Sequence, residues 1–206
     1  MKNLVIILLL CAIVFKSFSQ QQKTVSDCTV IYSMSNADAD SKNDFKNASK
    51  TIYIRGKQIR IDINSNAFDQ TIFYNDNTGE VTVLKNIGAE KYMSTYNSAD
   101  WQKEHSVYKG IKVSLTNKEK KILGYDCKEA ILQLQNGNTY TVYYLPGIIP
   151  SVTENNFEFR TVPGLVLQYE ASIHNEKIKY TATYLNFDPV PAFKFEIPKS
   201  GYKILN

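Results

Sequence analysis

The chain has 206 residues, of which 43% are hydrophobic and 12% aromatic, and it carries a formal net charge of +4. This length suffices for one domain with a substantial core. The charge is too small for the electrostatic footprint of a nucleic-acid-binding protein, so no nucleic acid is expected as a partner. The densest charge run, KEKK at 118–121, is interpreted as a solvated turn.

The N-terminus has the pattern of a secretory signal peptide. Lys2 supplies the positive charge, an unbroken apolar run covers residues 4–15, and the small residues Ser17 and Ser19 precede a cut after position 19. The apolar run is shorter than the about 20 residues that span a bilayer. The sequence therefore predicts an exported protein, periplasmic or extracellular.

Two alternatives remain for this segment. It could stay uncleaved as an anchor, or Cys11 could be acylated, although three leucines stand where a lipoprotein signal has small residues. Cleavage removes Lys2 and Lys16, which lowers the net charge from +4 to +2. We expect residues 1–19 to be the signal peptide and residues 20–206 to form a single domain.

The first half of the mature chain alternates apolar and polar residues with the period of two that is typical of strands. Ile59, Ile61 and Ile63 are the clearest example, and Gly56-Lys57 before them predicts a tight turn. A short helix is expected over 98–108, capped by Ser98. Strands are predicted at 28–33, 52–55, 59–64, 71–74, 80–84 and 91–96.

The second half continues with hairpins. A hairpin is predicted from 122 to 145 around the Asn136-Gly137 turn, and another from 165–173 to 178–185. Residues 147–163 form a connector with a helical turn near 154–157. Strands joined by tight turns are antiparallel, and a twisted sheet of ten strands tends to curl. The predicted fold is mainly β (α+β): one strongly curved antiparallel sheet, an open half-barrel of about ten strands, with one or two short helices on its concave side.

Two cysteines remain after cleavage, Cys28 and Cys127. In an oxidising compartment such a pair invites a disulfide, which would close a loop of roughly 100 residues and stabilise the fold by roughly 4–5 kcal/mol. Two separate buried thiols are the alternative.

The stretches "KKILGYDCKEAILQLQNGNTYTVYYLPGIIP" and "TVPGLVLQYEA" resemble a group of exported bacterial domains. These are the GLPGLI family and a related family of uncharacterised domains. The matching positions are Ile122, Gly124, Tyr125, Cys127, Ala130, Pro163, Gly164 and Leu165, and the closing "FEIPKSGYK" is similar as well. Thr161 and Val162 depart from the GLPGLI motif, which leaves open which of the two families applies.

The resemblance implies a LolA/LolB-like lipoprotein-carrier fold, in which the concave face of the sheet accepts acyl chains. It brings no catalytic residues. Independently of it, Pro163-Gly164 is typical of a type II turn with glycine at positive φ. Gly124 inside a strand indicates a bulge or a sharp bend.

Catalytic and metal-binding patterns are missing from the sequence. The two histidines, His105 and His174, have no ligand-spaced neighbours, and no phosphate loop or nucleophile motif occurs. Acids near hairpin ends, such as Asp62, Asp69 and Asp76, are more typical of turns than of a cation site. We therefore expect no enzyme, no cofactor and no metal.

The expected function is binding. The hypothesis is an envelope protein that holds a lipid or another apolar small molecule in the concave face of its sheet. The alternative is an envelope module with a filled core that binds a protein partner. The candidate cavity residues alternate along the predicted strands: Leu132, Leu134, Tyr140, Val142, Tyr144, Leu165, Leu167 and Tyr169.

Overall fold

The computed structural model describes residues 22–37, 45, 47–153, 158–173 and 176–205. The predicted signal peptide, the predicted helical turn at 154–157 and His174 lie outside these residues. In the described part, the helical elements are α2 (Ser98–Glu104), η1 (Ser106–Tyr108) and η2 (Ala192–Phe195). The strands are β1 (Lys23–Val25), β2 (Asp27–Asn36), β3 (Ser49–Arg55), β4 (Gln58–Asn64), β5 (Asp69–Asn75), β6 (Val81–Ile87), β7 (Glu90–Tyr96), β8 (Lys112–Ile122), β9 (Tyr125–Gln133), β10 (Thr139–Pro146), β11 (Ile148–Pro150), β12 (Gly164–Ile173), β13 (Glu176–Asn186) and β14 (Lys203–Leu205).

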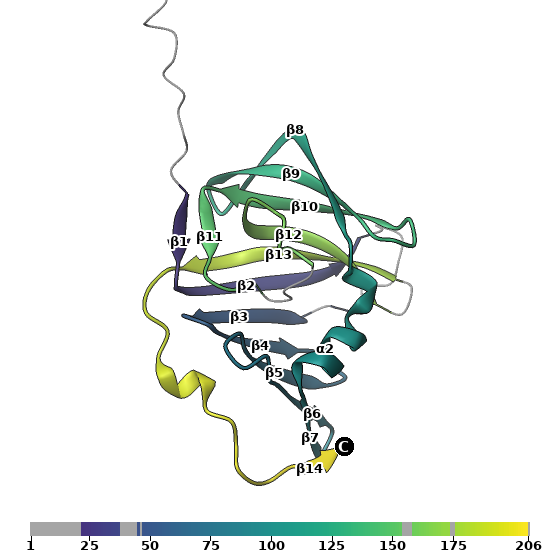
Figure 1. Cartoon of the computed structure of the whole chain (residues 1–206), viewed down its shortest axis with the longest axis vertical. Coiled ribbons are helices and arrows are strands. Elements are labelled where there is room, and N and C mark those ends of the chain that lie inside the picture. Colours follow the sequence, from purple (N-terminus) through teal and green to yellow (C-terminus); the bar gives the residue numbers. More distant parts are fainter. Residues whose placement is uncertain (1–21, 38–44, 46, 154–157, 174–175, 206) are drawn as a thin grey trace, which may run out of the picture.

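Twelve of these strands form one sheet in the order β14-β7-β6-β5-β4-β3-β2-β13-β12-β10-β9-β8 (Figure 1). Every pairing in it is antiparallel except that of β14 with β7. β1 and β11 form a separate parallel pair. The prediction of a mainly β protein with a large antiparallel sheet is confirmed, with twelve strands in the sheet rather than about ten. The half-barrel curvature stays a prediction.

One face of the sheet is set by a row of directly opposite residues. The row runs from Val30 on β2 to Leu205 on β14, by way of Ile52, Ile61, Ile72, Val83 and Ser94. Because directly opposite residues share a face, this row forms one continuous surface. Val30 is only 1% exposed and Leu205 is 50% exposed, so the face is covered at one end and open at the other.

Three segments lie on the two faces of the sheet. β11 and the residues after it lie over β2 and β3, and α2 lies beside β7 on the same face. The chain after β13 runs past β4, where Arg60 donates to the Lys194 carbonyl at 2.8 Å, and it ends as β14 (Figure 1). Arg60 is one residue before Ile61, so this tail lies on the opposite face.

Two glycines have roles that differ from the predicted ones. Gly124 does not form a bulge; with Leu123 it makes a two-residue hairpin turn between β8 and β9, and both residues have positive φ. Gly164, after Pro163, is not at positive φ, so the predicted type II turn is wrong. A Cβ on Gly164 would lie 2.3 Å from the Leu145 carbonyl oxygen, so glycine is needed there for the close approach of β12 to β10.

Other local predictions are corrected in detail. The KEKK run lies inside β8 and not in a turn. The helix at 98–108 is present as α2 and η1, but its cap is Asn97, whose side chain accepts from the Asp100 amide. The hairpin around Asn136-Gly137 is confirmed, although only Gly137 has positive φ and the turn spans 134–137.

Candidate functional site

The predicted cavity residues lie in the packed core. None of the eight is more than 6% exposed, and Leu167 and Val142 are fully buried. Leu165 borders a cavity of only about 40 Å³ beneath Pro150 and Phe159, from the segment that covers β2 and β3. Ligand sites have about 300–1,000 Å³, so this part of the face has room for little more than a water molecule.

Tyr169 is the centre of an aromatic cluster in this filled region. Its ring stacks on Tyr180 at 4.5 Å, and Tyr32 and Phe159 meet it edge-on at 5.7 and 5.0 Å. The buried Lys50 ammonium donates to the Tyr169 hydroxyl at 2.6 Å and lies 5.2 Å from both stacked rings. The cluster gives a buried cation the polar contact and the ring faces that it requires.

The open end of the same face holds a larger space, which we call the α2 hollow. Its volume is about 590 Å³. The floor comes from alternate residues of β5, β6 and β7 together with Leu205 of β14, and the wall comes from α2 and the residue after it. The lining residues are Gln70, Ile72, Val83, Lys85, Ile87, Tyr92, Ser94, Tyr96, Trp101, His105 and Leu205.

The wall of the α2 hollow is aromatic. Trp101 lies 5.5 Å from the Tyr96 ring and 4.1 Å from the His105 ring, and the His105 ring is followed by Tyr108 at 6.5 Å. The Asn97 cap fixes the first turn of α2, and the His105 Nδ1 atom lies 2.9 Å from the Trp101 carbonyl oxygen. These contacts hold the indole over the edge of the floor, where an apolar ligand would touch it.

The floor combines two chemical characters. One cross-strand row is Gln70, Lys85 and Tyr92, and the next is Ile72, Val83 and Ser94. The first row offers an amide, an ammonium and a phenol, whereas the second is mostly aliphatic. A molecule with a polar and an apolar end would match both rows.

A polar cluster lies elsewhere, on the other face of the sheet. The Glu129 carboxylate is almost completely buried and accepts from Tyr143 at 2.7 Å and Thr116 at 3.1 Å, with Lys118 at 3.4 Å. Burial alone would raise the pKa of Glu129, but these partners together lower it below its ordinary value. The pKa of Tyr143 rises to about 12, chiefly through its hydrogen bond to Glu129. The cluster holds β8, β9 and β10 together.

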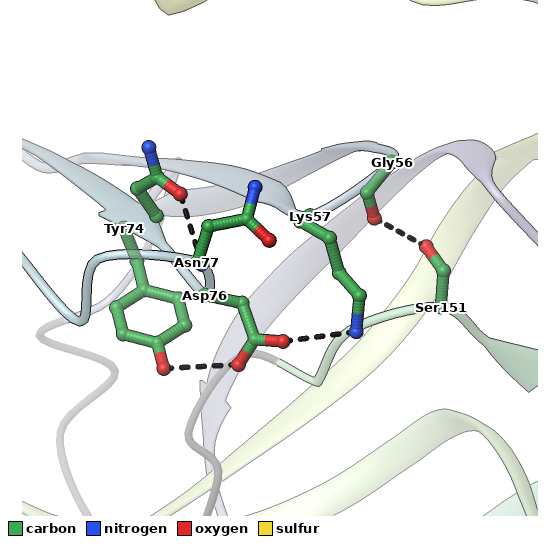
Figure 2. Close-up of polar contacts among 7 residues, drawn as sticks. Gly56, Lys57, Tyr74, Asp76, Asn77 and Ser151 are labelled. Atoms are coloured by element: carbon green, nitrogen blue, oxygen red, sulfur yellow. Dashed lines mark hydrogen bonds and ion pairs between the residues drawn. The ribbon is translucent and has the colours of Figure 1, made fainter.

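A second polar group joins the turn between β3 and β4 to the turn between β5 and β6 (Figure 2). Asp76 pairs with Lys57 at 3.0 Å and accepts from Tyr74 at 3.2 Å, while Ser151 donates to the Gly56 carbonyl at 2.5 Å. Burial and the nearby Asp76 raise the pKa of Tyr74 to about 12. These contacts account for Asp76 as a turn residue, as its position in the sequence predicts.

The remaining predicted residues are placed as follows. Cys28 and Cys127 are buried free thiols on β2 and β9, so the structure has no disulfide between them. Tyr125 is 39% exposed at the β8–β9 turn. Among the described residues, no group of three or more His, Cys, Asp or Glu side chains is placed to hold a metal ion. Within the same residues, no helix has the length and apolarity to span a membrane.

Comparisons with known proteins give weak structural likenesses. Two structures of PNGF-II, in the C2 and P21 space groups, have 16% and 15% identity and TM-scores of 0.48 and 0.46. They match 86% and 87% of this chain, which spans 30% and 32% of theirs. A crystal structure of MucB has 10% identity and a TM-score of 0.39 over 84% of this chain and 58% of its own.

No family model matches the chain, and no curated protein matches it. The resemblance to the GLPGLI-type families therefore stays a prediction, as does the LolA/LolB-like fold that it implies. Because all three TM-scores are below 0.5, we base the proposed function on the α2 hollow itself.

The residues of the α2 hollow were missed by the sequence analysis. Its strands were predicted, but Tyr92, Ser94 and Tyr96 show the same alternation as any half-buried strand. The one available signal was Trp101, an aromatic residue on a short helix with no buried position. A large apolar side chain on such a helix indicates that the helix packs against another part of the protein or against a ligand, but it does not identify which.

Proposed function

We propose that this chain is a non-enzymatic, exported envelope protein that binds the apolar chain of a small amphiphile in the α2 hollow. One observation carries the proposal: a space of about 590 Å³, within the range of ligand sites, lies on the core-side face of the sheet. We propose that this face is the concave one.

The lining supports this class of ligand. Ile72, Val83 and Leu205 offer aliphatic contacts, and Trp101 and Tyr96 add ring faces beside them. Transfer of apolar ligand surface into such a lining is favourable by about 25 cal/mol per Å². The lining side chains of the sheet are only half-buried or exposed, so a ligand can reach them.

The second candidate is an envelope interaction module without a small ligand. The filled middle of the face favours it, because the cavity beneath Phe159 holds only about 40 Å³. Under this alternative the α2 hollow is a surface depression for a protein segment. The two candidates differ in whether the free protein binds an alkyl chain.

The test uses Trp101, the only tryptophan of the chain. Dodecyl maltoside, titrated below its micelle concentration, is expected to shift the Trp101 emission to the blue and to saturate. Ser94→Phe, which fills the middle of the floor, is expected to weaken or abolish this binding. Thr95→Phe is the matched control, because Thr95 lies next in sequence and lines a space on the opposite face.

Two results would contradict the proposal. The first is no saturable shift with the wild-type protein, which would favour the interaction module. The second is equal weakening by Ser94→Phe and Thr95→Phe, which would place the alkyl chain outside the α2 hollow. Far-UV circular dichroism of both variants establishes that they are folded.

A further inference from the structure

Lys85 is the positive charge on the floor of the α2 hollow. It lies on β6, directly opposite Gln70 of β5 and Tyr92 of β7. The side chain is half-buried, and its ammonium lies 5.1 Å from the centre of the Phe68 ring. Ring contact on one side and a hollow on the other leave the ammonium accessible from the hollow.

The charges around Lys85 do not balance it. Among the described lining residues, Lys85 is the one with a side chain that is positively charged at neutral pH whatever its surroundings, and no carboxylate is present. Within the same part of the chain, Lys85 forms no ion pair. The neighbouring edge is different, since Glu90 and Lys203 pair with each other there. The hollow therefore has a positive charge on its floor with no acidic side chain to meet it.

The position of Lys85 relative to the apolar floor selects the shape of the ligand. Val83 lies two residues before Lys85 on the same strand face, a spacing of about 7 Å. An alkyl chain over Val83 and Ile72 would thus bring its first polar group to the Lys85 ammonium. The Gln70 amide and the Tyr92 hydroxyl stand on either side as further donors to oxygen atoms.

We infer that the α2 hollow selects an amphiphile with one alkyl chain and an anionic oxygen head group, carboxylate or phosphate, which Lys85 binds. This inference rests on the proposed function and adds the class of head group. Charge-assisted hydrogen bonds are stronger than neutral ones, and the half-exposed position of Lys85 keeps the effect modest because water screens the charge. The expected preference for an anionic head is about tenfold in Kd.

The experiment compares four head groups on the same dodecyl chain by Trp101 fluorescence. Dodecanoate and dodecyl phosphate represent the two anionic sources, dodecyl maltoside is neutral, and dodecyltrimethylammonium is cationic, each below its micelle concentration. At least one anionic compound is expected to bind about tenfold more tightly than the maltoside. The tighter of the two identifies the head group, and the preference should shrink in high salt.

Three variants assign the effect to Lys85. Lys85→Gln should abolish the anionic preference, so that this variant binds the anionic compounds no more tightly than it binds the maltoside, and Lys85→Arg should retain the preference. Lys91→Gln is the matched control, because Lys91 is exposed and lies one residue from Tyr92, on the other face of β7. It should bind all four compounds as the wild type does.

The outcomes separate this inference from the proposed function. Equal Kd values for the anionic and neutral compounds, or an anionic preference that survives Lys85→Gln, overturn the inference and leave the proposed alkyl-chain site standing. Tighter binding of the cationic compound overturns it as well. If no dodecyl compound binds, both the inference and the proposed function are wrong. Thermal unfolding of Lys85→Gln at the wild-type temperature shows that the variant is folded.

Discussion

At Gly164 the structure and the sequence pattern predict opposite effects of a substitution. A type II turn with positive φ would tolerate asparagine better than alanine, whereas a close contact would tolerate alanine better than asparagine. In Gly164→Ala, the new Cβ would lie 2.3 Å from the Leu145 carbonyl oxygen and 2.6 Å from the Tyr144 ring, distances that real Cβ atoms essentially never show. One of the two close atoms is backbone, so β10 itself must move. The cost is at the upper end of overpacking in a core, about 3 kcal/mol of unfolding free energy.

Gly124 provides the opposite case within the same sheet. Its φ is +83°, and nothing lies within 4 Å of an added Cβ. Gly124→Ala therefore costs only backbone strain, about 1 kcal/mol. Asparagine tolerates the left-handed region, so Gly124→Asn should be milder than Gly124→Ala. At Gly164 the order reverses, and asparagine should destabilise more than alanine, because the larger side chain meets the same Leu145 and Tyr144 atoms.

The four variants are compared by urea unfolding at 25 °C, followed by circular dichroism and by Trp101 fluorescence. The expected order of stability is Gly124→Asn, Gly124→Ala, Gly164→Ala and Gly164→Asn, from most to least stable. A loss of less than about 1 kcal/mol in Gly164→Ala would refute the close-approach argument. Gly164→Asn proving more stable than Gly164→Ala would do the same, and would restore the type II turn with positive φ.

Three further outcomes are expected. Leu123 has a φ of 52° and is 41% exposed, so Leu123→Asn should raise the unfolding free energy by about 1 kcal/mol in the same urea assay; an unchanged value would contradict strain at this turn. The pKa of Glu129 is lowered on folding, so its stabilisation is present above the ordinary glutamate pKa of about 4.3 and is lost as the pH falls through the folded-state value. Glu129→Gln should therefore cost about 1.5 kcal/mol at pH 7, with a smaller difference from wild type at pH 3, and a pH-independent difference would contradict this assignment. Burial raises the pKa of Cys28 to about 12 and that of Cys127 to about 11, so a thiol reagent should titrate both cysteines only after unfolding; an unfolded, unreduced protein with no reactive thiol would indicate a disulfide.

The strands with one buried face were predictable from the sequence. Ile59 and Ile61 alternate with polar residues, and in the structure they are 0% and 3% exposed. β8 was missed because its residues are almost all exposed until Ile122, so the edge strand has no alternation to detect. β14 was missed for another reason: three residues pair with β7, more than 100 positions earlier, and no local pattern encodes such a contact.

The candidate cavity residues predicted from the sequence lie in the packed part of the sheet and do not line the α2 hollow. The alternation at Leu165, Leu167 and Tyr169 indicates that one side of the strand is apolar. A strand that faces a packed core and a strand that lines an empty pocket show the same alternation. The difference depends on whether another segment covers the face. That covering comes from Pro150 and Phe159, whose positions over β2 and β3 follow from tertiary packing and not from their own sequence pattern.

The size of the covering segments explains why the face is filled at one end and open at the other. α2 has seven residues and is therefore about 10 Å long, whereas the strands from β5 to β14 span about 14 Å across the sheet. A helix of this size covers one edge of that surface and leaves the middle uncovered. The α2 hollow thus follows from a short helix after β7, and a ligand with an alkyl chain would complete the layer that α2 begins.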